Sequence, residues 1–468
     1  MSPRKRIPFI FILFVCVMAA SLAGLTADAR AAASGARLWA KIVTPAVTAS
    51  TDMVLSVAPG PNGSVYACGV YDYPIFSGYL WVARYSAAGR LQWLRKYGES
   101  LGIDANANAM TVDKQGDPIV VGQAVVAGNT NALTLKYSPN GTLRWARQFD
   151  GAVSGQDFAT AVAVDGAGGI YVAGATADVG TGLDYLVVKY DKSGHRRFVS
   201  TYSGPFGDDV VAAVAVGDAG SVYVTGHSQN ASGIDDCETA KLSSSGPWKW
   251  FRRFASPGGF ADYGQQIAAS AGGVYVDGIA GSALDASGDD ILLLKYSTGG
   301  SRPWARTWDG PAHLQDNGPG LAVDAAGNAW VAGWSYASGS KDRAVLIKWD
   351  AAGRRQWVQT YRHSGINDSE FNDVVVDSSG RAWCAGWQAG GARFERSSAS
   401  GPRIFDDTHF VVAKYAASGS PAWARSWTSS HQTAMAQTLC LSGSGVYVGG
   451  WSTRPASGRD PALLKYKP

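Results

Sequence analysis

Seven aspartates recur along the chain at intervals of 52 to 54 residues, each at the start of a short apolar segment. Carboxylate oxygens are the ligands that hard cations such as Ca²⁺ prefer, so a convergent set predicts a cation-binding ring. Seven like charges brought together need protons, cations or hydrogen-bond donors. The alternative is that each carboxylate accepts backbone N–H bonds of its own turn. The seven are Asp52, Asp104, Asp157, Asp209, Asp262, Asp316 and Asp368.

The other chemistry-bearing side chains form no catalytic motif. The six histidines show no HExxH spacing, and the sequence has no GxSxG elbow and no P-loop. Apart from Cys16, the cysteines are Cys68, Cys237, Cys384 and Cys440; they form no CxxC pair, and we expect buried free thiols. The sequence thus predicts no catalytic residue and no cofactor, with calcium at the aspartate ring the one exception to consider. It favours a protein that is not an enzyme.

A tryptophan four residues after a glycine marks a repeat. Seven such pairs run from Gly35–Trp39 to Gly419–Trp423, and Gly194–Phe198 fills an eighth position. Successive pairs lie 52 to 54 residues apart except for one gap of 66, a period typical of repeat architectures. Each unit holds four short β-branched or aromatic segments between Gly, Asp, Asn and Ser turns, so each segment is a predicted strand. We therefore predict an all-β fold, an eight-bladed β-propeller of four-stranded antiparallel blades.

The two ends of the chain complement each other. The last repeat stops at Pro468 without its fourth strand, and residues 35–43 supply one, so we expect the N-terminal strand to complete the last blade. Residues 32–468 are then one propeller domain. Residues 1–31 combine Arg4, Lys5 and Arg6 with an apolar run and small residues near Ala29, the layout of a secretory signal peptide; the alternative is an uncleaved membrane anchor.

This signal predicts a secreted or cell-surface protein with no transmembrane helix after cleavage. The formal net charge is +4, and the first thirty residues, with four basic side chains against one acidic, supply +3 of it. The remaining chain therefore lacks the basic bias typical of nucleic-acid binders, which excludes that class.

The repeat unit resembles the bacterial β-propeller repeat family called SBBP. The shared pattern is roughly D-x-x-x-A-V-A-V-D-x-x-G-x-x-Y-V-x-G, then L-x-x-K-Y-D-x-x-G-x-x-x-W, and it covers nearly all of residues 35–468. The resemblance implies an exported or cell-surface bacterial protein and adds little chemistry. The hairpin that carries the Trp is also similar to that of pyrroloquinoline-quinone propellers with eight blades, but the adjacent cysteine pair of that family is missing here.

Departures from the repeat identify candidate ligand-binding residues. The residue after the second-strand glycine is Trp in three consecutive units, Trp334, Trp387 and Trp451, and it is His227 in the fourth. The seventh unit has a long insertion near residues 391–407 that carries Arg393, Phe394 and Arg396. Function usually resides in such loops on a rigid scaffold, and Trp offers a large contact area for a sugar ring or peptide. The alternative is that these rings pack between blades.

These observations predict an exported binding or interaction module, expected to be a monomer, with an extracellular glycan or a protein or peptide as ligand. The competing hypothesis is an extracellular enzyme on a propeller scaffold, either quinoprotein-like or active on polysaccharides.

Overall fold

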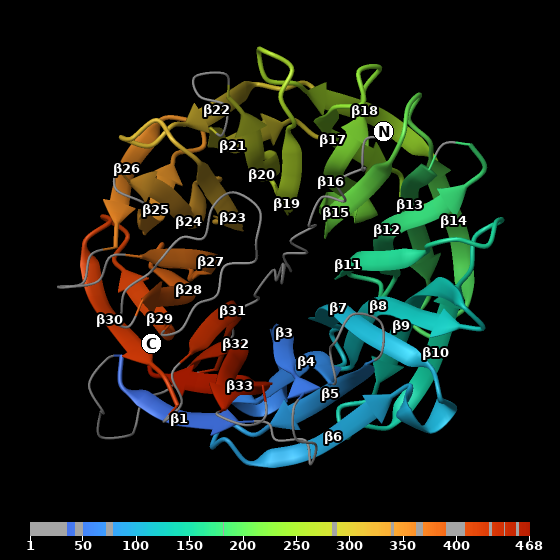
Figure 1. Cartoon of the computed structure of the whole chain (residues 1–468), viewed down its shortest axis with the longest axis horizontal. Helices are drawn as coiled ribbons and strands as arrows, with labels where there is room; N and C mark the ends of the chain where they lie inside the picture. Colours follow the sequence, from blue (N-terminus) through green and yellow to red (C-terminus); the bar gives the residue numbers. More distant parts are fainter. Residues whose placement is uncertain are drawn as a thin grey trace, which may run out of the picture.

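The computed structural model describes residues 35–42, 50–71, 78–180, 182–282, 288–337, 341–361, 368–389, 408–429, 433–443, 445–454 and 458–468. Eight antiparallel sheets, each built on four strands, stand around a central axis as the blades of a propeller (Figure 1). The first strand of each blade (strand A) is innermost, and the fourth (strand D) is outermost. The predicted fold class is confirmed.

The strands follow the order A, B, C, D in every blade except the last. Blade 1 is β3 (Met53–Pro59), β4 (Val65–Tyr71), β5 (Tyr79–Tyr85) and β6 (Leu91–Tyr97), and blade 2 is β7 (Asp104–Val112), β8 (Pro118–Val126), β9 (Asn129–Tyr137) and β10 (Leu143–Phe149). Blade 3 is β11 (Phe158–Val164), β12 (Ile170–Asp178), β13 (Gly182–Tyr190) and β14 (Arg196–Tyr202). Blade 4 is β15 (Asp209–Val216), β16 (Val222–Gln229), β17 (Asp235–Leu242) and β18 (Trp248–Phe254).

Blades 5 to 7 continue the same order. Blade 5 is β19 (Tyr263–Ser270), β20 (Gly273–Gly281), β21 (Asp289–Tyr296) and β22 (Trp304–Trp308). Blade 6 is β23 (Asp316–Val323), β24 (Ala329–Ala337), β25 (Lys341–Trp349) and β26 (Arg355–Thr360). Blade 7 is β27 (Ser369–Val376), β28 (Ala382–Ala389), β29 (Thr408–Tyr415) and β30 (Pro421–Trp427).

Blade 8 joins the two ends of the described chain, in the order β31 (Ala434–Ser442), β32 (Gly445–Arg454), β33 (Gly458–Tyr466) and β1 (Arg37–Ile42). The short β2 (Ser50–Thr51) pairs in parallel with β33. The helical elements of the described residues are three short 3-10 turns, η1 (Pro61–Gly63), η2 (Glu99–Leu101) and η3 (Asp218–Gly220). None of the helices in the described chain has the length and apolar character to cross a membrane.

Closure of the ring depends on β1. In Figure 1 the blue β1 lies beside the red β33, and the two strands pair antiparallel with Trp39 opposite Lys465. The Trp39 indole and the Lys465 ammonium both donate to the carbonyl oxygen of Ala87 in blade 1, at 3.1 and 2.9 Å. The predicted completion of the last blade by the N-terminal strand is therefore confirmed.

The same contact explains the repeated glycine and tryptophan. In blade 2, Trp145 Nε1 and Lys136 Nζ both donate to the Lys192 carbonyl of the next blade. Gly194 of that turn has φ +82°, and a Cβ built on it would lie 2.7 Å from the Trp145 ring. The Gly-x-x-x-Trp motif thus pairs each tryptophan with the glycine of the following blade. The basic residue of strand C that faces the motif aromatic makes the same kind of bond in most blades, to a carbonyl in the C–D turn of the next blade. The further examples are Arg84, Lys189, Lys241, Lys295 and Lys348.

A second glycine position is fixed by a β-bulge in strand A. The strand-B glycine faces that bulge, and in blade 4 a Cβ on Gly226 would lie 1.9 Å from the Val210 carbonyl oxygen. The same approach, at 1.9 or 2.0 Å, occurs in all eight blades, which is why only glycine fits there. The eight residues are Gly69, Gly122, Gly174, Gly226, Gly278, Gly333, Gly386 and Gly450.

The hydrophobic core is divided among the blade interfaces. One cluster combines Tyr66 and Val82 of blade 1 with Met110 and Leu133 of blade 2, and equivalent clusters follow around the ring. Cys68, Cys237, Cys384 and Cys440 are buried free thiols, as predicted. Because each blade buries its faces against two neighbours, the stability of the ring requires every blade to be complete.

Candidate functional site

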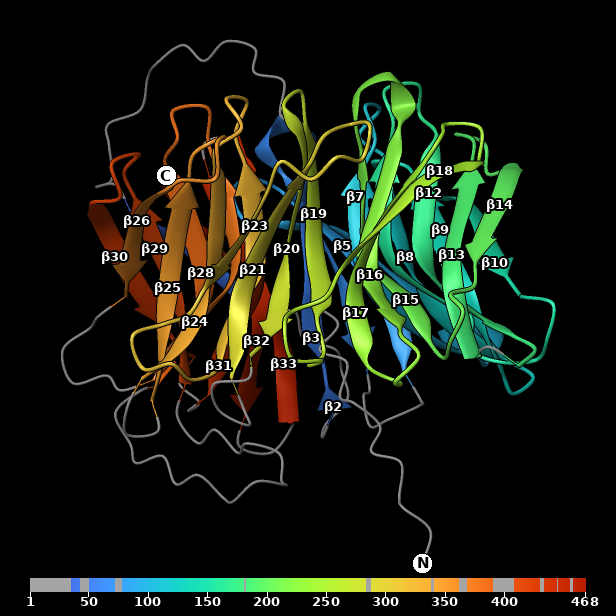
Figure 2. The same ribbon diagram turned by 90° about the horizontal axis from the view of Figure 1, so that it is seen from above.

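The two ends of the ring differ in how much their residues vary from one blade to the next. At one end lie the A–B and C–D turns. In most of them the amide of residue i donates to the carbonyl of residue i+4, as in Asp113–Asp117 and Asp191–His195. The A–B turns of blades 5 and 8 are tighter, with Ser270 paired to Gly273 and Ser442 paired to Gly445. At the other end lie the starts of the A strands, the B–C loops and the loops between blades, and we call this end the B–C face (Figure 2 views the ring from the side). Residues that differ from blade to blade gather on the B–C face, which makes this face the candidate site.

The repeated aspartates open the A strands on this face, and most of them serve the blade junctions. Six are buried at 0 to 6% exposure, and Asp104 is half-buried. The Gly151 amide donates to Asp157 Oδ2 at 2.7 Å, the Ser256 amide to Asp262 Oδ2 at 2.6 Å, and the Asp342 amide to Asp368 Oδ1 at 2.8 Å. The carboxylates at these positions therefore accept backbone N–H bonds, which was the alternative to a cation-binding ring. Binding of calcium by the ring stays a prediction.

Burial perturbs several of these acids. Desolvation raises the pKa of Asp209 and of Asp262, and it raises the pKa of Asp316 to about 7. Asp373, in β27 of blade 7, accepts the Leu439 amide of blade 8 at 2.9 Å, and burial raises its pKa to about 7 as well. Each such group keeps its proton in the folded state to a higher pH than in the unfolded chain.

We expect Asp373→Asn to become more stable relative to the parent protein as the pH rises from 5 to 8. The unfolded chain loses the Asp373 proton near pH 4 and the folded chain near pH 7, so the folded state loses stability across this window, by the order of a few kcal/mol. Thermal melts at four pH values would measure the difference. Asp350→Asn is the control, because hydrogen bonds lower the pKa of that half-buried turn acid, so that it titrates below the window. A pH-independent difference for Asp373→Asn would contradict the assignment.

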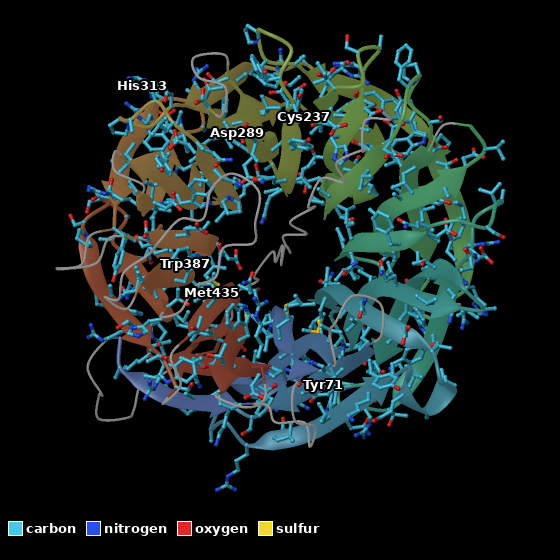
Figure 3. All side chains as sticks on the ribbon, in the orientation of Figure 1. Tyr71, Cys237, Asp289, His313, Trp387 and Met435 are labelled. Atoms are coloured by element: carbon cyan, nitrogen blue, oxygen red, sulfur yellow. The ribbon has the colours of Figure 1, made fainter. Side chains whose placement is uncertain are left out.

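The structure places the three predicted tryptophans differently. Trp387 and Trp451 are only 3 and 4% exposed and pack with Met435 in one cluster, labelled in part in Figure 3, whereas Trp334 is half-buried. Trp387 Nε1 donates to Glu370 Oε2 at 3.0 Å, and the Arg459 guanidinium lies 4.2 Å from the Trp451 ring centroid. Packing inside the protein thus explains most of the surface of Trp387 and Trp451. Of the three tryptophans, Trp334 has the most surface left to contact a ligand.

His227 lies on the same face, at blade 4. Its ring makes an edge contact with Tyr263 of blade 5 at 5.3 Å, and the Tyr263 hydroxyl donates to Asp235 Oδ2 at 2.9 Å. Burial lowers the pKa of His227, although Asp235 and Asp208 oppose the shift. A neutral imidazole beside an aromatic ring can accept or donate a hydrogen bond to a polar ligand. Arg393, Phe394 and Arg396 lie outside the described residues.

A charged network in blade 4 was not predicted from the sequence. Glu238 is 3% exposed and bonds to Arg253, which also contacts Asp236 and Ser228. Burial raises the pKa of Glu238 to about 6, although Arg253 lowers it. The sequence did hold a sign of this network, because Glu238 takes the position opposite the strand-B glycine, which is apolar in the other seven blades. The seven apolar residues are Trp81, Leu133, Leu186, Leu292, Val345, Val411 and Ala462.

Asp316 meets two further acids, Asp290 and Asp309, at the junction of blades 5 and 6. Single carboxylate oxygens of Asp290, Asp309 and Asp316 lie within 4.8 Å of one another. The sequence placed Asp316 among the repeated aspartates but gave no reason to join it to Asp290 or Asp309, which belong to other segments of the repeat.

Comparison with known proteins supports the fold. No family model matches the sequence, and no curated protein matches it. Among solved structures, Sqt1 from Chaetomium thermophilum superposes with a TM-score of 0.54 at 12% identity, covering 90% of this chain and 98% of that one. The polysaccharide lyase Uly1 gives a TM-score of 0.43 at 11% identity, covering 77% and 89%. At these identities the likeness to Sqt1 concerns the fold alone, and the likeness to Uly1 carries no argument. The fold is that of a propeller able to serve as a binding or scaffold module.

Proposed function

We propose that this protein is an exported, non-enzymatic binding module that holds a glycan or a peptide on its B–C face, with no cofactor other than calcium. The observation that carries the proposal is the one-sided distribution of unusual residues. Trp334, His227 and the Glu238–Arg253 network all lie toward the B–C face, while most turns of the other face share one hydrogen-bonded form. The apolar and basic start of the sequence and its resemblance to SBBP repeats support export.

Trp334 is the proposed centre of recognition. It follows the strand-B glycine of blade 6, lies opposite Ala344 in β25, and is only half-buried. Half-exposed Trp rings stack on sugar or peptide surfaces and still offer an N–H donor, which is why they dominate many binding sites. Trp387 and Trp451 give the neighbouring rim its shape through their packing with Met435.

Single replacements should separate binding from packing. We expect Trp334→Ala to weaken binding of the ligand found on a glycan or peptide array by roughly tenfold or more, with the melting temperature nearly unchanged. Trp387→Ala and Trp451→Ala should instead cost stability, on the order of 3 kcal/mol each, because both rings are buried. The measurements are titration calorimetry and thermal melts. If the Trp334→Ala variant melts several degrees lower but binds the ligand normally, the Trp334 ring belongs to the core and not to a binding site.

A polysaccharide-active enzyme is the second candidate, and Glu238 is the observation in its favour. A buried carboxyl group with a pKa of about 6 lies in the range that suits general acid catalysis. Arg253, however, engages it in an ion pair at 3.1 Å. The binding proposal expects no release of reducing ends or unsaturated sugars from any bound polysaccharide. If the protein degrades a polysaccharide and Glu238→Gln abolishes that activity, the protein is an enzyme and the binding proposal is wrong.

A further inference from the structure

The carboxylates of Asp290, Asp309 and Asp316 come together from three segments at one blade junction. Asp290 is in β21 of blade 5, Asp309 lies in the loop between β22 and β23, and Asp316 opens β23 of blade 6. Figure 3 labels two residues beside them, Asp289 and His313, which lie in the same sector of the ring. One oxygen from each of the three carboxylates lies within 4.8 Å of the other two.

The hydrogen bonds of Asp316 leave one of its oxygens unfilled. The side chain is fully buried, and its Oδ2 accepts the Gly310 amide at 2.5 Å. Its Oδ1 is buried with no donor in hydrogen-bonding geometry anywhere in the described ranges, although the Ser335 hydroxyl lies near enough to lower the pKa of the group. Asp309 Oδ1 is in the same situation. Two buried oxygens at this junction, one on Asp309 and one on Asp316, are therefore open to a positive partner.

At two other blade junctions both oxygens of the corresponding aspartate are filled by donors. Asp262, which opens the A strand of blade 5, accepts the Ser256 amide on Oδ2 and the Gly281 amide on Oδ1. Asp157 of blade 3 accepts the Gly151 amide and the Thr176 hydroxyl. Asp209 of blade 4 resembles Asp316, because its Oδ1 is also buried with no donor in the part of the chain that the structure describes. The junction of blades 5 and 6 differs from that of Asp209 because Asp316 meets two further carboxylates there, those of Asp290 and Asp309.

The negative charge of Asp309 and Asp316 is also poorly compensated. Asp309 faces the exposed His313, whose Nδ1 lies 2.5 Å from Asp309 Oδ2. Within the described ranges of the chain, no Lys or Arg lies within ion-pair distance of Asp309 or Asp316. Burial raises the pKa of Asp316 to about 7, and the charges of Asp290 and Asp309 raise it further in the same direction, so a positive charge placed among them would be stabilised.

We propose that Asp290, Asp309 and Asp316 bind a calcium ion that ties blade 5 to blade 6. Calcium–oxygen distances are about 2.4 Å, so two ligands of one ion lie at most about 4.8 Å apart, which matches the observed cluster. A set of carboxylate oxygens favours calcium over zinc, and water completes the six to eight ligands, roughly, that calcium takes. The ion would fix the B–C face beside blade 6, whether or not a ligand binds at Trp334.

Terbium luminescence and thermal melts test this site on the full chain after treatment with a chelator. Trp308 directly precedes Asp309 in the sequence and can transfer excitation to a terbium ion bound there. We expect a saturable terbium signal that calcium displaces, and a melting temperature that rises by several degrees with calcium and less with magnesium. Asp290→Asn and Asp309→Asn should each weaken calcium binding by roughly tenfold or more, because each removes a charged ligand.

The matched controls separate binding from general charge effects. Asp262→Asn changes the equivalent aspartate whose oxygens are filled by amides, and Asp350→Asn changes a half-buried acid in a turn of the opposite face. Both variants should keep the calcium affinity of the parent protein. The proposal is overturned if calcium neither shifts the melt nor displaces terbium, if the Asp290 and Asp309 variants bind calcium as tightly as the controls do, or if zinc binds and calcium does not.

Discussion

Deletion of β1 (Arg37–Ile42) is expected to abolish cooperative folding or to lower the melting temperature by ten degrees or more. The deletion removes the pairing with β33, the bond of Trp39 to Ala87, and the contacts of the Trp39 ring with Tyr85 and Tyr447. Loss of a fully buried Trp ring costs about 3–5 kcal/mol, so loss of the half-buried Trp39 ring removes a sizeable part of the roughly 5–15 kcal/mol that stabilises a folded domain. It also exposes the edge of β33.

Calorimetry or circular dichroism would record the melt. Trp39→Ala should fall between the deletion and the parent protein, because it keeps the strand but loses the ring. Leu38→Ser is the matched control on the same strand, since Leu38 is 44% exposed and should change the melting temperature little. A deletion variant that melts cooperatively at the parent temperature would show that the ring closes without this strand.

Gly226→Ala is expected to destabilise the protein by at least about 2 kcal/mol. The added Cβ would lie 1.9 Å from the Val210 carbonyl oxygen, a backbone atom held in the bulge of β15, so two paired strands must shift. The measurement is the free energy of unfolding from denaturant titration, where the midpoint should fall and the m-value should stay constant.

Gly299→Ala is the control for this substitution. Gly299 lies in an exposed turn, a Cβ added there would have Ser297 Oγ as its nearest neighbour at 3.8 Å, and its φ is not positive. The free energy of unfolding should change by no more than about 0.5 kcal/mol. Equal effects of the two substitutions would refute the steric account of the eight strand-B glycines.

The architecture was largely predictable because it repeats. The period of the Gly-x-x-x-Trp pairs and the incomplete last unit were sufficient to predict eight blades and their closure. The sequence could not show that Trp145 packs on Gly194 of the next blade, since spacing within one chain segment says nothing about which blade a ring faces. The same limit applies to Gly226, whose requirement comes from a bulge in β15 that no local pattern marks.

The candidate site was only partly predictable, because it depends on contacts between blades. The sequence identified Trp334, Trp387 and Trp451 as one rim, but their burial depends on Met435 and on neighbouring strands, which separate Trp334 from the other two. Asp290, Asp309 and Asp316 belong to different segments and meet only at the junction of blades 5 and 6. Glu238 was open to detection, since its position is apolar in the other blades, but only once strand register aligned them.

The most direct test of the central claim, that ligands bind on the B–C face, is hydrogen–deuterium exchange with and without the ligand selected on an array. The account predicts protection in the segments next to Trp334, at the end of β24, and near His227, at the end of β16, with no change in the opposite-face turns 113–117 and 191–195. Protection of those turns with an unchanged B–C face would contradict it.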